Sequence, residues 1–352
     1  MLRPIAAGLV AASLLMGAGS AQAEVRLGLH PDHLADTDIA RMGQGGAKVM
    51  RLPLDWRLVE PFEGAPYDFV EHDRIIRAAA IAGIQVLPLI GFSTPWTAET
   101  AAEQPDTKSG LAQHDTYVRA MVRRYKPGGD FWVANPGIPQ LPLTEWQIWN
   151  EPNLTKHWTG PLHPKHYVPF LKRVRQVVLG EDPEAGIVLA GMPEFHQEYP
   201  CSDFIRDLYK IKGVQRLFDT VAVNTYMRRT KGLETVLRRL RSLMDKNGDK
   251  EKDIWISEMG WASDGPKRNE AVTDIEGQAE NLAEGFRLLK RRDERYRLSA
   301  AVWYTLKDHE LDPRNKNVFW YHTGLFALDG TPKPSWLAFT EATGGDPGTG
   351  PL

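Results

Sequence analysis

Two glutamates, each at the end of a short apolar run, are the residues of this sequence best suited to chemistry. The first run leads into the string W-N-E-P-N at residues 149–153, whose glutamate is Glu151. The second run, residues 254–257, leads into Glu258, which Gly260 and Trp261 follow. Hydrolysis of a glycosidic bond uses such a pair of carboxyl groups, one as acid and base and the other at the anomeric carbon.

The apolar runs before these glutamates predict buried strands. Pro152 cannot continue a strand ladder, so the first strand should end at Asn150 and Glu151. A strand that stops there presents both side chains at its carboxyl end, which is where a parallel α/β barrel carries its active site. The fold must then bring Glu151 and Glu258 together.

The first 23 residues have the pattern of an export signal. Arg3 supplies the positive charge, residues 5–16 form an apolar centre, and Ala21-Gln22-Ala23 is a cleavage site of small residues. A membrane anchor is the alternative, but the apolar run is too short to span a bilayer. We therefore predict a signal peptide over residues 1–23, no stable membrane insertion, and a bacterial protein that is exported to the periplasm or secreted.

Composition excludes several classes of partner. The 352 residues carry a net charge of −2, which provides neither a basic face for nucleic acid nor a polybasic membrane patch. Cys201 is the single cysteine, so stability must come from a large core rather than from an intramolecular disulfide. The 11 tryptophans can in part provide flat surfaces on which sugar rings stack. We expect a monomer that binds carbohydrate.

Short apolar runs alternate with amphipathic stretches along the chain. Eight runs are predicted strands: residues 25–29, 48–52, 85–90, 145–149, 186–190, 220–223, 253–256 and 300–303. The predicted helices are residues 69–82, 115–125, 165–179, 202–211, 233–246, 275–292 and 334–341. This alternation favours an α/β fold of the closed (β/α)8 TIM-barrel type in a single domain over residues 24–343. An open sheet would need a nucleotide-binding loop, and the sequence has no such glycine motif. The glycine-rich residues 344–352 are predicted to be a disordered tail.

The motifs resemble those of clan A glycoside hydrolases, retaining (β/α)8-barrel enzymes, and most of all family 39 and related enzymes that degrade exopolysaccharides. W-N-E-P-N at the fourth strand and residues 255–261 at the seventh carry this resemblance. Weaker support comes from Arg51, the string N-T-Y at residues 224–226, Trp303, and the segment 324–336. The matches run in the expected order over essentially the whole chain after residue 23.

The resemblance implies a role for each matching residue. Glu151 corresponds to the general acid/base, for which we expect a raised pKa, and Glu258 corresponds to the nucleophile. Arg51 and Tyr226 are the expected hydrogen-bond donors to Glu258. The remaining matches would contact the sugar: Asn150 its 2-hydroxyl, and Trp303 its lower face. Asn224 stands where the family often has histidine, which leaves its part in sugar recognition open.

Other candidate positions are less specific. His30 ends the first predicted strand and could reach the sugar or cap a loop, while Trp96 and Trp261 could extend the cleft or belong to the core. Pairs of histidines such as His163 and His166 have the spacing of metal ligands, but no further ligands accompany them in the sequence. We therefore predict neither a metal site nor a cofactor.

These observations together predict a β-glycosidase that cleaves a β-linked oligo- or polysaccharide through a covalent glycosyl-enzyme. Endo action on an exopolysaccharide is the first prediction, and exo action of the β-xylosidase type is the alternative within the same chemistry. A non-catalytic carbohydrate-binding barrel is the alternative from another class. The retention of both glutamates favours an enzyme. The sequence does not separate hydrolysis from transglycosylation.

Overall fold

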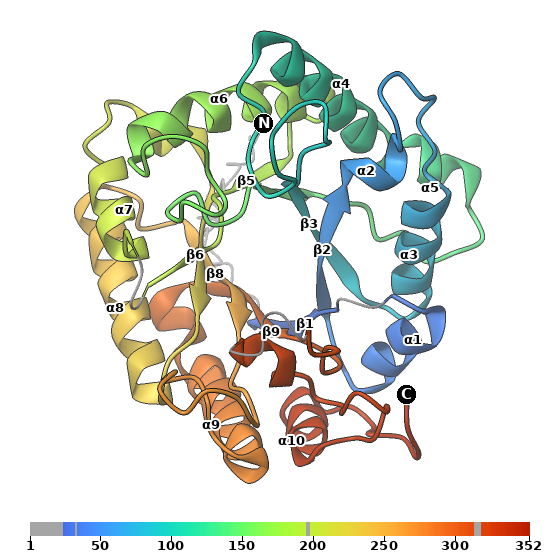
Figure 1. Ribbon diagram of the computed structural model, residues 1–352, viewed down its shortest axis with the longest axis vertical. Coiled ribbons are helices and arrows are strands. Elements are labelled where there is room, and N and C mark those ends of the chain that lie inside the picture. The colour runs from blue at the N-terminus through green and yellow to red at the C-terminus, as the bar shows by residue number, and fades with distance from the viewer. Residues whose placement is uncertain (1–23, 32–33, 195–197, 313–317) are drawn as a thin grey trace, which may run out of the picture.

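The computed structural model describes residues 24–31, 34–194, 198–312 and 318–352. The predicted signal peptide, residues 1–23, lies outside the described residues. The described chain forms a ring of parallel strands surrounded by helices (Figure 1).

The strands follow the order β5-β4-β3-β2-β1-β9-β8-β7-β6, and pairing of β5 with β7 closes the ring. The short β6 follows β5 and also pairs with β7, so these two segments share the fifth of eight barrel positions. The strands are β1 (Arg26–His30), β2 (Val49–Asp55), β3 (Gln85–Gly91), β4 (Glu145–Ile148), β5 (Gly186–Val188), β6 (Met192–Pro193), β7 (Thr220–Thr225), β8 (Asp253–Met259) and β9 (Leu298–Tyr304).

Helices pack around the outside of this barrel (Figure 1). They are α1 (Asp36–Gln44), α2 (Trp56–Val59), α3 (Val70–Ile81), α4 (Lys108–Tyr125), α5 (Asp130–Ala134), α6 (Pro164–Glu181), α7 (Cys201–Leu208), α8 (Thr230–Lys246), α9 (Ile275–Tyr296) and α10 (Pro334–Thr343), with two 3-10 turns, η1 (Val214–Leu217) and η2 (Phe319–His322). None of the described helices is both long and apolar enough to cross a membrane.

The strands are rich in Val, Ile and Leu because both of their faces are buried. One set of side chains fills the barrel interior: Val49, Leu87, Val188, Ala222, Trp255, Ala300 and Val302. The other set faces the helices and forms a larger core around the barrel. The apolar stripe of α8 shows why the helices stay attached: Leu233, Leu237 and Leu240 are buried there, and Arg238 opposite them is exposed.

The (β/α)8 barrel and all eight predicted strand positions are confirmed, with differences at the ends of elements. The helix α1 was not predicted, and α4 begins at Lys108 rather than Asp115. Gly83 follows α3 with φ 71°, the left-handed conformation that commonly ends a helix.

The prediction of a disordered tail over residues 344–352 was wrong. Trp336 Nε1 donates to Pro347 O at 2.9 Å, Arg41 Nη1 donates to the same carbonyl at 2.8 Å, and Leu352 N donates to Gly330 O at 2.9 Å. The segment packs beside α1 and α10. These contacts give hydrogen-bond partners to backbone groups that we expected, from composition alone, to be exposed to water.

Two buried histidines make the fold sensitive to acid. His114 of α4 lies among aromatic rings, 5.8 Å from that of Trp56 and 5.4 Å from that of Phe170, and neither of its ring nitrogens has a hydrogen-bond partner in the described chain. Burial lowers the pKa of His114 to about 3 and that of His72 to about 4, against an ordinary value of 6.5.

We expect the free energy of unfolding to fall as the pH is lowered from 6.5 toward 3, because the unfolded chain binds protons at these histidines first. The loss should be on the order of a few kcal/mol, since one unit of pKa difference corresponds to about 1.4 kcal/mol. Guanidinium chloride unfolding at several pH values measures it. His114→Phe should flatten the dependence, whereas His166→Gln, on an exposed residue, should not. An unchanged slope in His114→Phe would contradict the assignment.

Candidate active site

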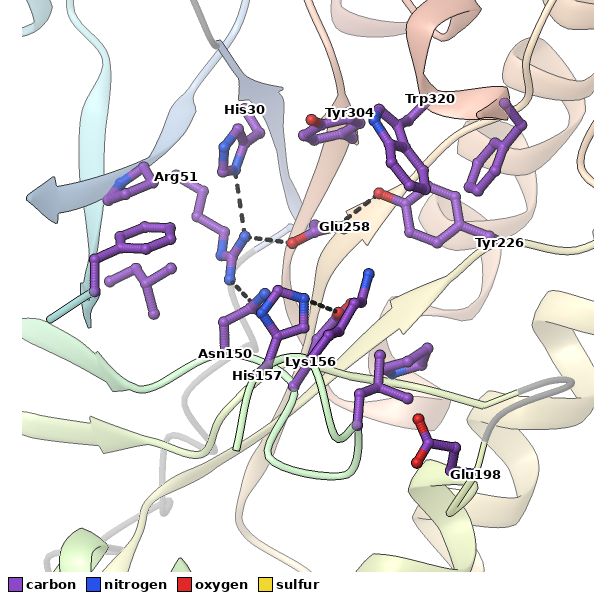
Figure 2. A pocket seen from close by; sticks show the side chains of 17 residues that line it. His30, Arg51, Asn150, Lys156, His157, Glu198, Tyr226, Glu258, Tyr304 and Trp320 are labelled. Atoms are coloured by element: carbon purple, nitrogen blue, oxygen red, sulfur yellow. Dashed lines mark hydrogen bonds and ion pairs between the residues drawn. The ribbon is translucent and has the colours of Figure 1, made fainter. Parts of the chain in front are cut away.

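A cavity of about 510 Å³ opens where the carboxyl ends of the barrel strands meet. Side chains from the strand ends and the loops that follow them line it, which is the expected location of an active site in this fold. Figure 2 shows these side chains converging on one space. Six of the ten predicted site residues line this cavity: His30, Arg51, Asn150, Glu151, Tyr226 and Glu258.

A tight turn at the end of β4 directs Glu151 into the cavity. Trp149 and Glu151 have φ values of 71° and 48°, in the left-handed region that costs a residue with a side chain roughly 1–3 kcal/mol. Two backbone bonds hold the turn in place: Trp149 N donates to Ile90 O at 2.8 Å, and Glu151 N donates to Gly191 O at 2.9 Å. Only a glycine fits opposite the turn, because a Cβ on Gly191 would lie 2.3 Å from Ser257 Oγ. The surrounding barrel therefore maintains this backbone conformation.

Glu258 lies in β8 and receives two short hydrogen bonds. Arg51 Nη1 donates to its Oε1 at 2.7 Å, and the Tyr226 hydroxyl donates to its Oε2 at 2.7 Å (Figure 2). Burial raises the pKa of Tyr226 well above its ordinary value of 10, and the neighbouring Glu258 adds to this, so the phenol stays protonated and donates. Both carboxylate oxygens are thus held in place by donors that suit an ionised side chain.

Arg51 connects most of the site. Its side chain is 1% exposed, and its remaining nitrogens bind Gln147 Oε1 at 2.7 Å and Asn150 Oδ1 at 2.9 Å. His30 Nδ1 lies 3.3 Å from Arg51 Nη1. A planar guanidinium with five donors can bind acceptors from several strands at once, which a lysine cannot. Arg51 therefore fixes residues from β1, β4 and β8 relative to one another.

Glu151 has a different set of partners. Asn224 Nδ2 donates to its Oε1 at 2.8 Å, and His157 Nε2 lies 3.1 Å from its Oε2. Ser257 Oγ donates to Asn224 Oδ1 at 2.7 Å, which turns the amide nitrogen of Asn224 toward the glutamate. Asn224 is fully buried, so the structure places it beneath Glu151 as a donor rather than on the surface of the cavity.

The pKa values of the two glutamates shift in opposite directions. Burial raises the pKa of Glu258; the charge of Arg51 opposes this shift and the nearby Glu151 carboxylate adds to it. Burial also acts upward on Glu151, but the hydrogen bond and charge of His157 and the charge of Lys156 outweigh it and lower its pKa. The prediction of a raised pKa for Glu151 was therefore wrong in direction, because it did not take His157 into account as a partner.

Three predicted tryptophans do not line the cavity. Trp303 is buried, donates from Nε1 to Thr323 O at 2.9 Å, and lies 6.0 Å from the ring of Trp261. Trp261 is also buried, against α9, where its ring lies beside Gly285. Trp96 packs edge-on against Trp56, with 6.3 Å between the rings. Since neighbouring residues of a strand point to opposite faces, Tyr304 rather than Trp303 faces the cavity.

Sequence reasoning missed several residues that line the cavity. Lys156 and His157 come from the loop after β4, Tyr304 ends β9, and Phe319 and Trp320 belong to η2. The position of His157, in the same loop as Glu151, was the only available signal. No three histidine, cysteine or acidic side chains of the described ranges are grouped so that they could hold a metal ion.

Fold and site together define a (β/α)8 barrel with a pair of buried glutamates at the carboxyl ends of its strands. The sequence matches no protein-family profile and no curated protein. Solved structures do match it, and those of glycoside hydrolases of families 39 and 5 share its fold, which is the fold that the predicted resemblance implied.

Two similar structures belong to family 39. A family 39 glycoside hydrolase from the gut symbiont Bacteroides cellulosilyticus superposes with a TM-score of 0.67 at 22% identity, over 91% of this chain and 64% of that one. A family 39 β-xylosidase from Caulobacter crescentus gives a TM-score of 0.65 at 18% identity, over 91% and 71% of the two chains. An exo-β-1,4-mannosidase from an Opitutaceae bacterium gives 0.61 at 16% identity, over 88% and 54%. This chain thus spans somewhat less than two thirds of the first of these proteins.

Arg51 offers a direct test of the site network. Arg51→Met should lower the free energy of unfolding by about 3–5 kcal/mol, because it leaves the buried Glu258 carboxylate without its cation. Arg206→Met is the matched control: its pair with Asp203 is exposed, and its loss should cost less than about 1 kcal/mol. Urea unfolding measures both variants. Equal losses would show that the network does not stabilise the barrel.

Proposed function

We propose that this protein is a retaining β-glycosidase in which Glu258 is the nucleophile and Glu151 the general acid/base. The observation that carries the proposal is the asymmetry of the two buried glutamates. Glu258 contacts the permanently charged guanidinium of Arg51 and the hydroxyl of Tyr226, both at 2.7 Å, which suits a nucleophile that must stay ionised. Glu151 instead contacts the neutral amide of Asn224 at 2.8 Å and the imidazole of His157 at 3.1 Å, neither of which is a permanent cation, which suits a group that must gain and lose a proton.

In the first step, Glu258 attacks the anomeric carbon while Glu151 gives its proton to the leaving glycosidic oxygen. A bond forms between the Glu258 carboxylate and the sugar, and the bond to the leaving group breaks. In the second step, Glu151, now ionised, takes a proton from water, and the water oxygen displaces Glu258. Two displacements at the same carbon give net retention of configuration.

Asn150 is placed to assist both steps. Its Oδ1 accepts a hydrogen bond from Arg51 Nη2 at 2.9 Å, which leaves its amide nitrogen to donate to the substrate. A donor to the sugar 2-hydroxyl strengthens its interaction as the ring flattens in the transition state. Tyr304 and His30 also line the cavity, with 5.2 Å between their rings, and offer ring surfaces to the sugar.

Residues outside the strand ends also line the cavity. Trp320 offers an aromatic surface, Lys156 lies with its ammonium 5.5 Å from the Trp320 ring, and Glu198 is a further polar group of the lining. These additional contacts support endo action on a β-linked polysaccharide, in which the leaving group is itself a chain. Exo action is the second candidate, because similar solved structures include a β-xylosidase and an exo-β-1,4-mannosidase.

We further propose that the protein works as a monomer outside the cytoplasm of a bacterium, in the periplasm or after secretion. The residues that support export are Arg3, the apolar segment 5–16 and the small residues before Glu24. An exopolysaccharide would be accessible to an enzyme in that location.

Covalent labelling tests the nucleophile. After treatment with a panel of 2-fluoro-glycosyl inactivators, intact-mass analysis should find one sugar per chain, and peptide mapping should place it on Glu258, because the fluorine slows the second step more than the first. Glu258→Gln should take up no label and lose turnover. Labelling at another carboxylate, such as Glu198, would contradict the assignment.

Glu151→Ala tests the acid/base. On aryl glycosides with activated leaving groups the first step should proceed at a nearly unchanged rate, because these groups leave without a proton. On polysaccharide the loss should be about 10²–10⁴-fold. Added azide should restore turnover of the activated substrate and give a β-glycosyl azide. Equal losses on both substrates would rule out this role.

A digestion time course separates the two modes of cleavage. Endo action should lower the average chain length of a susceptible polysaccharide before free monosaccharide appears. Exo action should release monosaccharide from the start and leave the viscosity almost unchanged.

A further inference from the structure

His157 contacts the glutamate that we assign as the acid/base, and it comes from an unexpected element. Its Nε2 lies 3.1 Å from Glu151 Oε2, and the two side chains are 21% and 10% exposed. The family that the sequence resembles often places a histidine at the end of the sixth strand, where this chain has Asn224. Here the histidine reaches Glu151 from the loop after β4.

The turn that orients Glu151 also holds His157 in place. The buried indole of Trp149 donates from Nε1 to His157 O at 2.9 Å, and His157 N donates to Leu154 O at 3.0 Å. Trp149 is itself packed edge-on against Phe170, with 5.4 Å between the rings. The histidine is therefore fixed by the same backbone that carries the glutamate.

We propose that His157 is a positioning residue that stabilises the ionised form of Glu151 and so favours its action as the base of the second step. This inference rests on the proposed function, because it assigns His157 an effect on the acid/base of that reaction. The imidazolium form of His157 donates to Oε2, and Asn224 donates to Oε1, so both oxygens of Glu151 receive hydrogen bonds suited to a carboxylate.

The other groups around Glu151 do not supply the same effect. The negative charge of Glu258 opposes ionisation of Glu151, Tyr226 is a neutral phenol bound to Glu258, and the exposed Lys156 acts on Glu151 through its charge alone. Burial acts to raise the pKa of Glu151, and the hydrogen bond from His157 is the largest of the contributions that lower it. Among the groups around Glu151, His157 is thus the main one that favours the ionised form.

The proton balance gives this interaction opposite effects on the two steps. In the first step Glu151 must hold a proton and pass it to the leaving oxygen, which a cation at His157 disfavours. In the second step Glu151 must take a proton from water, and a carboxylate stabilised by His157 is ready to do so. Loss of His157 should therefore extend the first step to higher pH and slow the second.

A titration without substrate tests the interaction itself. The protein is labelled with ¹³C at the glutamate carboxyl carbons and titrated by NMR. The signal of Glu151 is assigned as the one that is missing from the spectrum of Glu151→Gln. In His157→Ala the pH midpoint of this signal should rise by about 1 unit or more, the usual effect of removing an opposite charge at this distance. His157→Gln keeps a donor without the charge and should give a smaller rise. His166→Ala, on an exposed residue of α6, should give none.

Kinetics test the consequence. In His157→Ala the basic limb of the pH profile of kcat/KM should shift to higher pH together with the Glu151 midpoint. The second step should slow on the order of tenfold, so that the glycosyl-enzyme accumulates when the substrate is an activated aryl glycoside. Intact-mass analysis of the quenched reaction detects it. A merely structural role would lower activity at every pH without moving the limb.

The outcomes separate this inference from the proposed function. An unchanged Glu151 midpoint in both His157→Ala and His157→Gln overturns the inference, even if Glu258→Gln is inactive. A shifted midpoint together with an active Glu258→Gln supports the interaction and overturns the proposed nucleophile instead.

Discussion

The buried contact between Arg51 and Glu258 is the interaction on which the site depends. Removing a guanidinium and a carboxylate from water costs several kcal/mol per ion, and their attraction offsets this only if every donor and acceptor is satisfied. Here the 2.7 Å contact is completed by Gln147, Asn150 and Tyr226. Because these residues come from different strands, the network can form only in the closed barrel. The site therefore depends on the whole fold and not on one loop.

A second constraint is the left-handed backbone at the end of β4. Trp149 and Glu151 occupy a conformation that residues with side chains avoid, and the cost is offset by the buried indole and by backbone bonds to Ile90 and Gly191. Strain of this kind persists only where surrounding structure determines it. The result is a glutamate carried on a stiff turn, whose carboxyl group need not be ordered when a substrate binds.

Hydrophobic patterning was enough to predict the barrel, because strands buried on both faces read as continuous apolar runs. The two glutamates were found because each follows such a run. Asn150 was placed at the same strand end as Glu151, whereas Arg51 and Tyr226 were reached only through resemblance to known sequences. Trp303 shows what patterning cannot predict. Side chains of a strand alternate between its two faces, but the sequence does not say which residue faces the cavity, and here it is Tyr304. His157 was missed because its importance comes from a 3.1 Å contact that no spacing encodes. The tail was misjudged because glycine and proline content cannot reveal the carbonyls that bind Arg41.

The two glutamates are controlled by different parts of the molecule. The cation next to Glu258 is Arg51 of β2, buried within the barrel, so changing it disturbs packing as well as charge. The histidine beside Glu151 lies in the loop after β4, is partly exposed, and contacts the barrel mainly through its backbone. Substitution at position 157 can therefore change the surroundings of the Glu151 carboxyl group while Arg51 and Tyr226 keep Glu258 in place. A barrel built in this way can change the environment of one glutamate through a single loop without disturbing that of the other.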